Sequence, residues 1–169
     1  DDSLPPCVWL VAVDDVLDPR PLNLHIAYHT PCHMEKMGGV IYTLELLRAI
    51  PGVKVTVLDS QCCGIAGTYG FKSENYQTSQ AIGEGLFDQI NRLKPDLVIT
   101  DCQMPVMDGF ELTRSLRALG HGLPVWGFTA HAQPRERELC LATGMNDCLF
   151  KPIGLARLRA ALATLGPAP

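Results

Sequence analysis

The stretch DLVITDCQMPVMDG, residues 96–109, determines how the rest of the chain is interpreted. Its first half follows Pro95 and is a run of apolar and β-branched residues, which is typical of a buried strand. The strand ends on Asp101, and the chain then turns toward Gly109. In an open α/β sheet, the carboxyl end of a strand borders the crevice where such folds bind ligands. Asp101 is therefore a candidate functional acid, although a lone Asp at such a place more often caps a loop.

Strand and helix patterns alternate along most of the chain. The apolar patterns predict strands at 8–13, 24–29, 53–58, 96–101, 124–130 and 147–151, and helices at 40–50, 74–93, 109–119, 134–143 and 154–165. This alternation predicts an α/β fold: a three-layer, flavodoxin-like, doubly wound parallel sheet of five or six strands. The first two strand candidates have no helix between them, so either could occupy the central position beside the strand that ends on Asp101.

The composition excludes several classes of protein. The 169 residues are enough for one domain with a full core, and 47% of them are hydrophobic. A formal net charge of −4 gives no reason to expect a nucleic-acid partner, and the longest apolar run, residues 7–13, is too short for membrane insertion. Seven cysteines, an odd number, argue against a secreted disulfide framework and favour a reducing compartment, by default the cytoplasm.

The predicted carboxyl ends of the strands collect polar side chains. These are Asp14, Asp15, Asp101, Thr129 and Lys151. Three neighbouring carboxylates repel one another unless a divalent cation lies among them, and Mg²⁺ suits such oxygen ligands. A lysine and a hydroxyl beside them would complete a phosphoryl-transfer site. Taken singly, Thr129 is more simply a hydroxyl that caps a backbone group, and Lys151 a solvated surface lysine.

Two long motifs carry a resemblance to a known family. They are DLVITDCQMPVMDGFELTR, which begins at Asp96, and PVWGFTAHAQPRERELCLATGMNDCLFKPI, which begins at Pro124. On these motifs, residues 96–166 resemble the C-terminal part of a response-regulator receiver domain, closest to the receivers attached to hybrid sensor kinases. The shorter LVAVDD at residues 10–15 resembles the first strand of a receiver. The implied partner is a phosphohistidine donor, either a histidine kinase or a phosphotransfer domain, and the implied role is a phosphoacceptor rather than an enzyme.

The resemblance also implies a role for each site residue. Asp101 would be the phosphoacceptor, Thr129 the switch hydroxyl and Lys151 the lysine that contacts the phosphate. The implied ligands of Mg²⁺ are Asp14, Asp15, Asp101 and the main-chain carbonyl of Gln103.

Residues 22–94 resemble a different family, on the motifs LNLHIAYHTPCHMEKMGG and VTVLDSQCCGIAGTYGFKSENYQTSQAIGEGLFDQI. That family is the C-terminal cysteine-rich region found in the C subunit of anaerobic glycerol-3-phosphate dehydrogenase, of the CCG type shared with heterodisulfide reductases. The resemblance implies iron–sulfur binding and quinone-linked electron transfer, and thiolates are the natural ligands of such clusters. The family's cysteines fall here at Cys32, Cys62, Cys63 and Cys102. The fifth is replaced by Pro105, so the cluster site is incomplete.

The chain is therefore predicted to be one composite domain over residues 1–169. A receiver-like first strand occupies residues 1–20, a CCG-like βαβα segment residues 21–95, and a receiver-like C-terminal half residues 96–169. Three functions remain open: a phosphorelay receiver, an iron–sulfur module, and a folded chimera without native activity. If the strand at 24–29 takes the central position, the pocket loses Asp14 and Asp15, and Mg²⁺ binding should be feeble.

Overall fold

The computed structural model describes residues 20–29, 42–58, 76–102, 109–130 and 133–165. Within these residues, five parallel strands form one sheet in the order β2-β1-β3-β4-β5. The strands are β1 (Leu24–His29), β2 (Val53–Val57), β3 (Leu97–Asp101), β4 (Val125–Thr129) and β5 (Asp147–Phe150). This order is that of a flavodoxin-like, doubly wound sheet, which confirms the predicted fold class.

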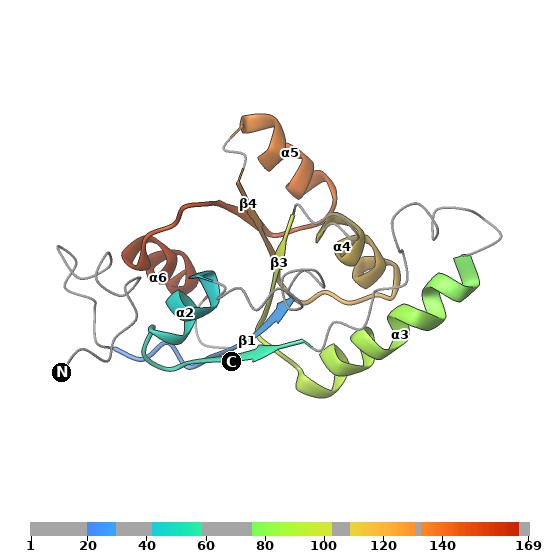
Figure 1. Cartoon of the computed structure of the whole chain (residues 1–169), viewed down its shortest axis with the longest axis horizontal. Helices are drawn as coiled ribbons and strands as arrows, with labels where there is room; N and C mark the ends of the chain where they lie inside the picture. Colours follow the sequence, from blue (N-terminus) through green and yellow to red (C-terminus); the bar gives the residue numbers. More distant parts are fainter. Residues whose placement is uncertain (1–19, 30–41, 59–75, 103–108, 131–132, 166–169) are drawn as a thin grey trace.

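Five helices connect and cover the strands. They are α2 (Tyr42–Arg48), α3 (Tyr76–Leu93), α4 (Gly109–Ala118), α5 (Pro134–Ala142) and α6 (Leu155–Ala163). Figure 1 shows α2 and α6 on one side of the sheet, and α3 and α4 on the other. Gly144, which follows α5, has a φ of +100°, a left-handed conformation that favours glycine after a helix. None of the helices in the described part of the chain is both long and apolar enough to cross a membrane.

The sheet separates two apolar layers. The layer under α2 and α6 is built from buried side chains of both helices and of the central strands, including Ile26, Leu47, Ile99, Phe128, Leu158 and Leu162. The layer on the opposite face, under α3, α4 and α5, includes Ala27, Ile90, Val98, Leu112, Cys140 and Cys148. Two covered faces explain why the strands are apolar in nearly every position, as buried parallel strands are.

The strand beside β3 on one edge is β1, and not the competing candidate at residues 8–13. The register places Ile26 opposite Leu97 and His29 opposite Thr100. The other edge of β3 pairs with β4, so both edges are filled. Residues 8–13 lie outside the described residues. Five of the six residues of β1 are buried, as a central strand requires.

A double hydrogen bond fixes the start of this pairing. The backbone nitrogen of His25 donates to a carboxylate oxygen of Asp96 over 2.7 Å, and the backbone nitrogen of Asp96 donates to the carbonyl oxygen of His25 over 2.8 Å. One of these residues comes from the CCG-like segment and the other from the receiver-like half. The two segments therefore share one continuous sheet.

Candidate functional site

Three of the predicted site residues lie at the carboxyl ends of three adjacent strands. Asp101 ends β3, Thr129 ends β4, and Lys151 directly follows β5. The Lys151 Nζ donates to the carboxylate of Asp101, and the two groups form an ion pair. The backbone nitrogen of Lys151 also donates to the carbonyl oxygen of Thr129 over 2.7 Å. Parallel pairing thus brings together residues separated by as many as 50 positions in the sequence.

The site is partly open to solvent. The side chain of Asp101 is 13% exposed and that of Lys151 is 32% exposed, whereas Thr129 is fully buried. A small anion from solvent could therefore reach the acid and the ammonium group. The peptide bond between Lys151 and Pro152 is cis. The arrangement places a positive charge and a hydroxyl-bearing residue near an acidic oxygen, which are groups suited to binding a phosphoryl group.

Gly109 allows α4 to begin directly against the end of β3. A Cβ at this position would lie 2.6 Å from Cγ2 of Thr100 and 2.8 Å from the carbonyl oxygen of Asp101. Both distances are shorter than real side chains show, so only glycine fits without a shift. The hydroxyl of Thr113 donates to the carbonyl oxygen of Gly109 over 2.7 Å and closes this first turn. Glycine at position 109 thus allows α4 to pack closely against the backbone of Asp101.

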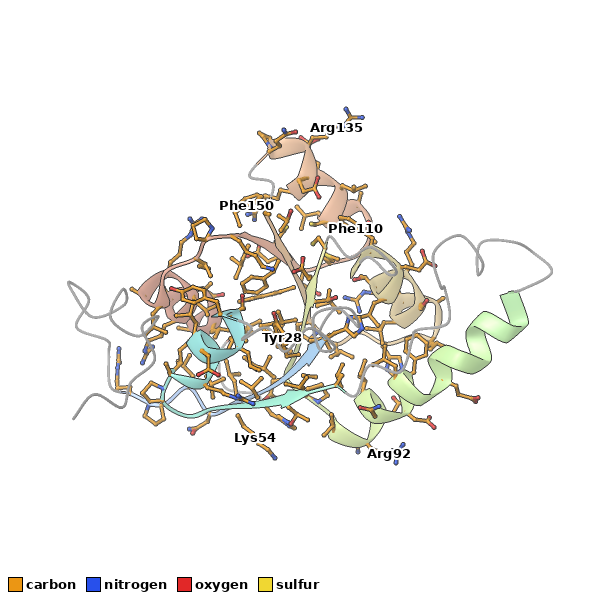
Figure 2. All side chains as sticks on the ribbon, viewed as in Figure 1. Tyr28, Lys54, Arg92, Phe110, Arg135 and Phe150 are labelled. Carbon is orange, nitrogen blue, oxygen red and sulfur yellow. The ribbon has the colours of Figure 1, made fainter. Side chains whose placement is uncertain are left out.

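The end of β1 supplies a histidine and a tyrosine to this edge. His29 is 2% exposed, and its Nδ1 lies 3.2 Å from the hydroxyl oxygen of Thr100. Burial lowers the pKa of His29 to about 4, so the ring is neutral near neutral pH. Burial also raises the pKa of Tyr28 to about 12, and the negative charge of Asp101 acts in the same direction. Figure 2 shows Tyr28 near the centre of the molecule.

The sequence patterns predict neither aromatic residue as part of the site. The signal that could have found them was the placement of residues 24–29, because the last residues of the central strand border the ligand crevice. Once β1 is central, His29 is the residue that its carboxyl end brings beside Thr100. The sequence alone could not choose between the two strand candidates.

The predicted Mg²⁺ ligands are only partly within the described residues. Among the described residues, Asp101 supplies a carboxylate at the carboxyl ends of the strands. The other three predicted ligands, Asp14, Asp15 and Gln103, lie outside the described residues, so their roles remain predictions. An Mg²⁺ ion is commonly held by one or two carboxylates together with phosphate oxygens and water. The described donor set fits that mode of binding, with Asp101 as the one carboxylate.

Of the four predicted cluster ligands, the structure describes Cys102 alone. Cys32, Cys62 and Cys63 lie outside the described residues. The Sγ of Cys102 is 3.7 Å from the Sγ of Cys140, and both thiols are buried together with that of Cys148. The described thiols beside Cys102 therefore come from the receiver-like half.

A doubly wound parallel sheet with an acid, a hydroxyl and a lysine after three adjacent strands defines a receiver-type phosphoacceptor module. Residues 68–163 match the family model of the response regulator receiver domain, and the chain belongs to this family. Residues 26–104 match the model of the CCG cysteine-rich domain. The two matches overlap over residues 68–104, which include β3, and they confirm that the chain combines segments resembling two families.

Curated relatives divide in the same way. The chain is 65% identical over 98 residues to the C subunit of anaerobic glycerol-3-phosphate dehydrogenase from Escherichia coli, and the match covers 58% of this chain and 24% of that protein. It is 59% identical over 70 residues to the sensor protein EvgS of Escherichia coli, covering 41% of this chain and 6% of that protein. The chain thus spans a quarter or less of the length of these relatives.

Solved structures with a similar fold are receiver domains. One is the receiver domain of a sensor histidine kinase from Pseudomonas aeruginosa, described with a magnesium ion coordinated in its active-site cleft. It is 26% identical, with a TM-score of 0.55, and the match covers 85% of this chain and 97% of that one. A second is the receiver domain of a Francisella response regulator, at 19% identity and a TM-score of 0.57, which covers 85% of this chain and 96% of that one and shows the fold alone.

Proposed function

We propose that the protein is a phosphorelay module in which Asp101 accepts a phosphoryl group from a phosphohistidine donor, a histidine kinase or a phosphotransfer domain. The observation that carries this proposal is the contact between the Lys151 ammonium group and the Asp101 carboxylate, beside Thr129 at the end of the adjacent strand. In this proposal the chain acts as one composite domain, which the pairing of β1 with β3 in one sheet supports.

The proposed reaction is a direct transfer. A carboxylate oxygen of Asp101 attacks the phosphorus, the bond between phosphorus and the donor's imidazole nitrogen breaks, and the imidazole leaves with the electron pair. The product is an aspartyl phosphate. Lys151 then moves from the carboxylate to the new phosphoryl oxygens, where its charge offsets theirs, and the hydroxyl of Thr129 donates to one of them.

The family resemblance implies Mg²⁺ as the cofactor of this transfer. When bound, the ion would neutralise charge on the phosphoryl oxygens. Asp101 would hold it, with the Gln103 carbonyl, Asp14 and Asp15 as the further predicted ligands. Since residues 24–29, and not the strand candidate that precedes Asp14 and Asp15, pair with β3, we expect weak affinity for free Mg²⁺. The phosphoryl donor adds oxygen ligands, so a lower concentration of Mg²⁺ should saturate the site when the donor is present.

The test is chemical labelling with acetyl phosphate. Incubation with acetyl phosphate and Mg²⁺ should add the mass of one phosphoryl group to the intact protein. Asp101→Asn should abolish the addition, because an amide cannot form the acyl phosphate. Asp88→Asn, at an exposed position on α3, is the matched control and should be labelled like the parent. Unchanged labelling of the Asp101→Asn variant would overturn the proposal.

The match of residues 26–104 to the CCG family supports a second candidate, an iron–sulfur electron-transfer module. Its predicted ligands are Cys32, Cys62, Cys63 and Cys102. Anaerobic loading with iron and sulfide should then give a coloured protein, and Cys62→Ala should remove the colour. A protein that stays colourless overturns this candidate. If labelling fails as well, the remaining function is a folded chimera without native activity.

A further inference from the structure

Three buried cysteines converge beneath α5. Cys102 follows β3, Cys140 lies on α5 and Cys148 on β5, and each is at most 1% exposed. Their Sγ atoms all lie within 4.8 Å of one another, and those of Cys102 and Cys140 are 3.7 Å apart. Three sulfur ligands bound to one metal at about 2.3 Å would be separated by roughly 3.8–4.0 Å. Small side-chain shifts would therefore bring all three thiols onto one ion.

Gly127 on β4 lets these sulfur atoms lie directly against the strand backbone. A Cβ at this position would be 2.4 Å from the Sγ of Cys102, 2.8 Å from the Sδ of Met145 and 3.6 Å from the Sγ of Cys140. Sulfur atoms therefore occupy the place that a side chain at position 127 would take. Any larger residue at position 127 would displace the thiols, so the glycine preserves the cluster.

The chemistry of the donors restricts the ligand. Thiolate and thioether groups favour soft ions such as Cu⁺ and Zn²⁺ over hard ions such as Mg²⁺. We propose that Cys102, Cys140 and Cys148 form a binding site for one thiophilic d¹⁰ metal ion, Cu⁺ or Zn²⁺, with the thioether of Met145 as a neighbouring soft donor. This site is separate from the phosphoacceptor and does not depend on the proposed phosphoryl transfer.

Binding of the ion would displace the thiol protons into solvent, because the thiolate is the form of cysteine that binds a metal.

Metal binding would tie α5 to the sheet. Cys140 is the buried residue of α5, and the Arg137 guanidinium forms an ion pair over 3.0 Å with Asp147 at the start of β5. Figure 1 shows α5 extending away from the rest of the molecule. An ion held by thiolates from α5, β5 and the end of β3 would link this helix to the strand that carries Asp101.

The experiment uses Cd²⁺ as a spectroscopic probe of the full chain, under reducing and oxygen-free conditions. Four cysteines outside the described residues, Cys7, Cys32, Cys62 and Cys63, are replaced by Ala so that only the cluster remains. Titration should give sulfur-to-cadmium charge-transfer absorption that saturates at one ion per chain. The absence of this absorption, in a chain whose circular dichroism matches the parent, overturns the proposal.

A second substitution localises the ion. Cys140→Ala should lower the absorption at saturation by about a third or more, because one of three metal–sulfur bonds is lost. Leu141→Ala, at an exposed position on the same helix, should leave it unchanged. Absorption that Cys140→Ala does not alter overturns the site. If the four-alanine chain does not fold, the same comparison in the intact chain decides the question.

Two further measurements identify the ion and exclude a merely structural effect. Met145→Leu should weaken Cu⁺ binding several-fold if the thioether is a ligand. An unchanged Cu⁺ affinity, with Zn²⁺ bound more tightly in competition, assigns a trithiolate Zn²⁺ site.

Cd²⁺ should also slow amide hydrogen exchange in α5, residues 134–142. Exchange in α5 that Cd²⁺ leaves unchanged would contradict the proposed link to the sheet.

Discussion

The Nδ1 atom of His29 lies 3.2 Å from the hydroxyl oxygen of Thr100, across the junction between the two family-like segments. His29 ends β1, which belongs to the CCG-like segment, and Thr100 precedes the phosphoacceptor candidate Asp101 on β3. Both residues are buried. The contact therefore satisfies two buried polar groups at once, and it joins the segments within one residue of the candidate site.

The buried imidazole of His29 should make folding sensitive to acid. Its pKa is about 4 in the folded protein against an ordinary value of 6.5, so the unfolded chain binds the proton more readily. The stability is present above pH 6.5 and is lost as the pH falls from 6.5 toward 4, by up to about 3 kcal/mol. Urea unfolding at pH 7.5 and pH 5 measures this loss as the change in free energy of unfolding.

Substitution of the histidine isolates its share of that loss. His29→Asn keeps a polar group near Thr100 and cannot titrate in this range, so the drop between pH 7.5 and pH 5 should shrink by at least about 1 kcal/mol. His121→Asn, in the α4–β4 connection, is the matched control. An equal drop in the parent and the His29→Asn variant would show that other groups cause the acid sensitivity.

Two of the helical glycines, Gly109 and Gly85, should respond to alanine in opposite directions. Gly109→Ala introduces a Cβ 2.6 Å from Thr100, and this overpacking should cost about 1–3 kcal/mol of stability and slow the labelling of Asp101. Gly85→Ala, inside α3 with no atom within 4 Å of the new Cβ, should stabilise the protein by about 0.5–1 kcal/mol. Urea unfolding of the two variants tests both signs, and a stabilised Gly109→Ala protein would refute the close-approach argument.

Loss of the Lys151 ammonium group should impair phosphoryl transfer more than folding. Lys151→Met should slow labelling by acetyl phosphate about ten-fold or more, since a hydrogen bond to a charged group contributes about 1.5–3 kcal/mol. The free energy of unfolding should change by about 1 kcal/mol or less, because the Asp101 ion pair is partly exposed. The same replacement at Lys54, which points outward in Figure 2, should leave the labelling rate unchanged. Equal rates in both variants would remove Lys151 from the proposed site.

The guanidinium of Arg117 should be important for stability. It donates to the carbonyl oxygens of His121, Leu123 and Gly144 over 2.7–3.1 Å, and so fastens the end of α4 to the loops before β4 and β5. Arg117→Ala leaves these acceptors to solvent or unpaired and should lower the free energy of unfolding by about 2 kcal/mol.

Two comparisons sharpen that prediction. Arg117→Lys should recover only part of the loss, because an ammonium group cannot reproduce the planar fork of donors. Arg114→Ala, which removes an exposed ion pair with Glu111, should cost less than about 1 kcal/mol. Chemical denaturation of the three variants gives the order, and equal losses at positions 114 and 117 would contradict it.

Local patterns are sufficient to predict the strands and helices of the described chain. The apolar run at 96–101, for example, predicts a strand, and the structure places β3 at Leu97–Asp101. The predicted helix at 40–50 is shorter in the structure, where α2 covers Tyr42–Arg48. Motif context predicts Asp101 and Lys151 as site residues, and the structure brings them into contact. Their chemical roles remain predictions until labelling is measured.

The sequence by itself determined the alternation of strands and helices, the glycine at position 109 and the candidate acid at position 101, because each depends on neighbouring residues. Only the tertiary structure decided that residues 24–29 pair with β3, since residues 8–13 carry an equally apolar pattern and pairing between distant strands leaves no local signal. For the same reason, the cluster of Cys102, Cys140 and Cys148 could not be predicted from the sequence. These thiols meet only because parallel strand pairing and the packing of α5 bring three distant positions to one face of the sheet.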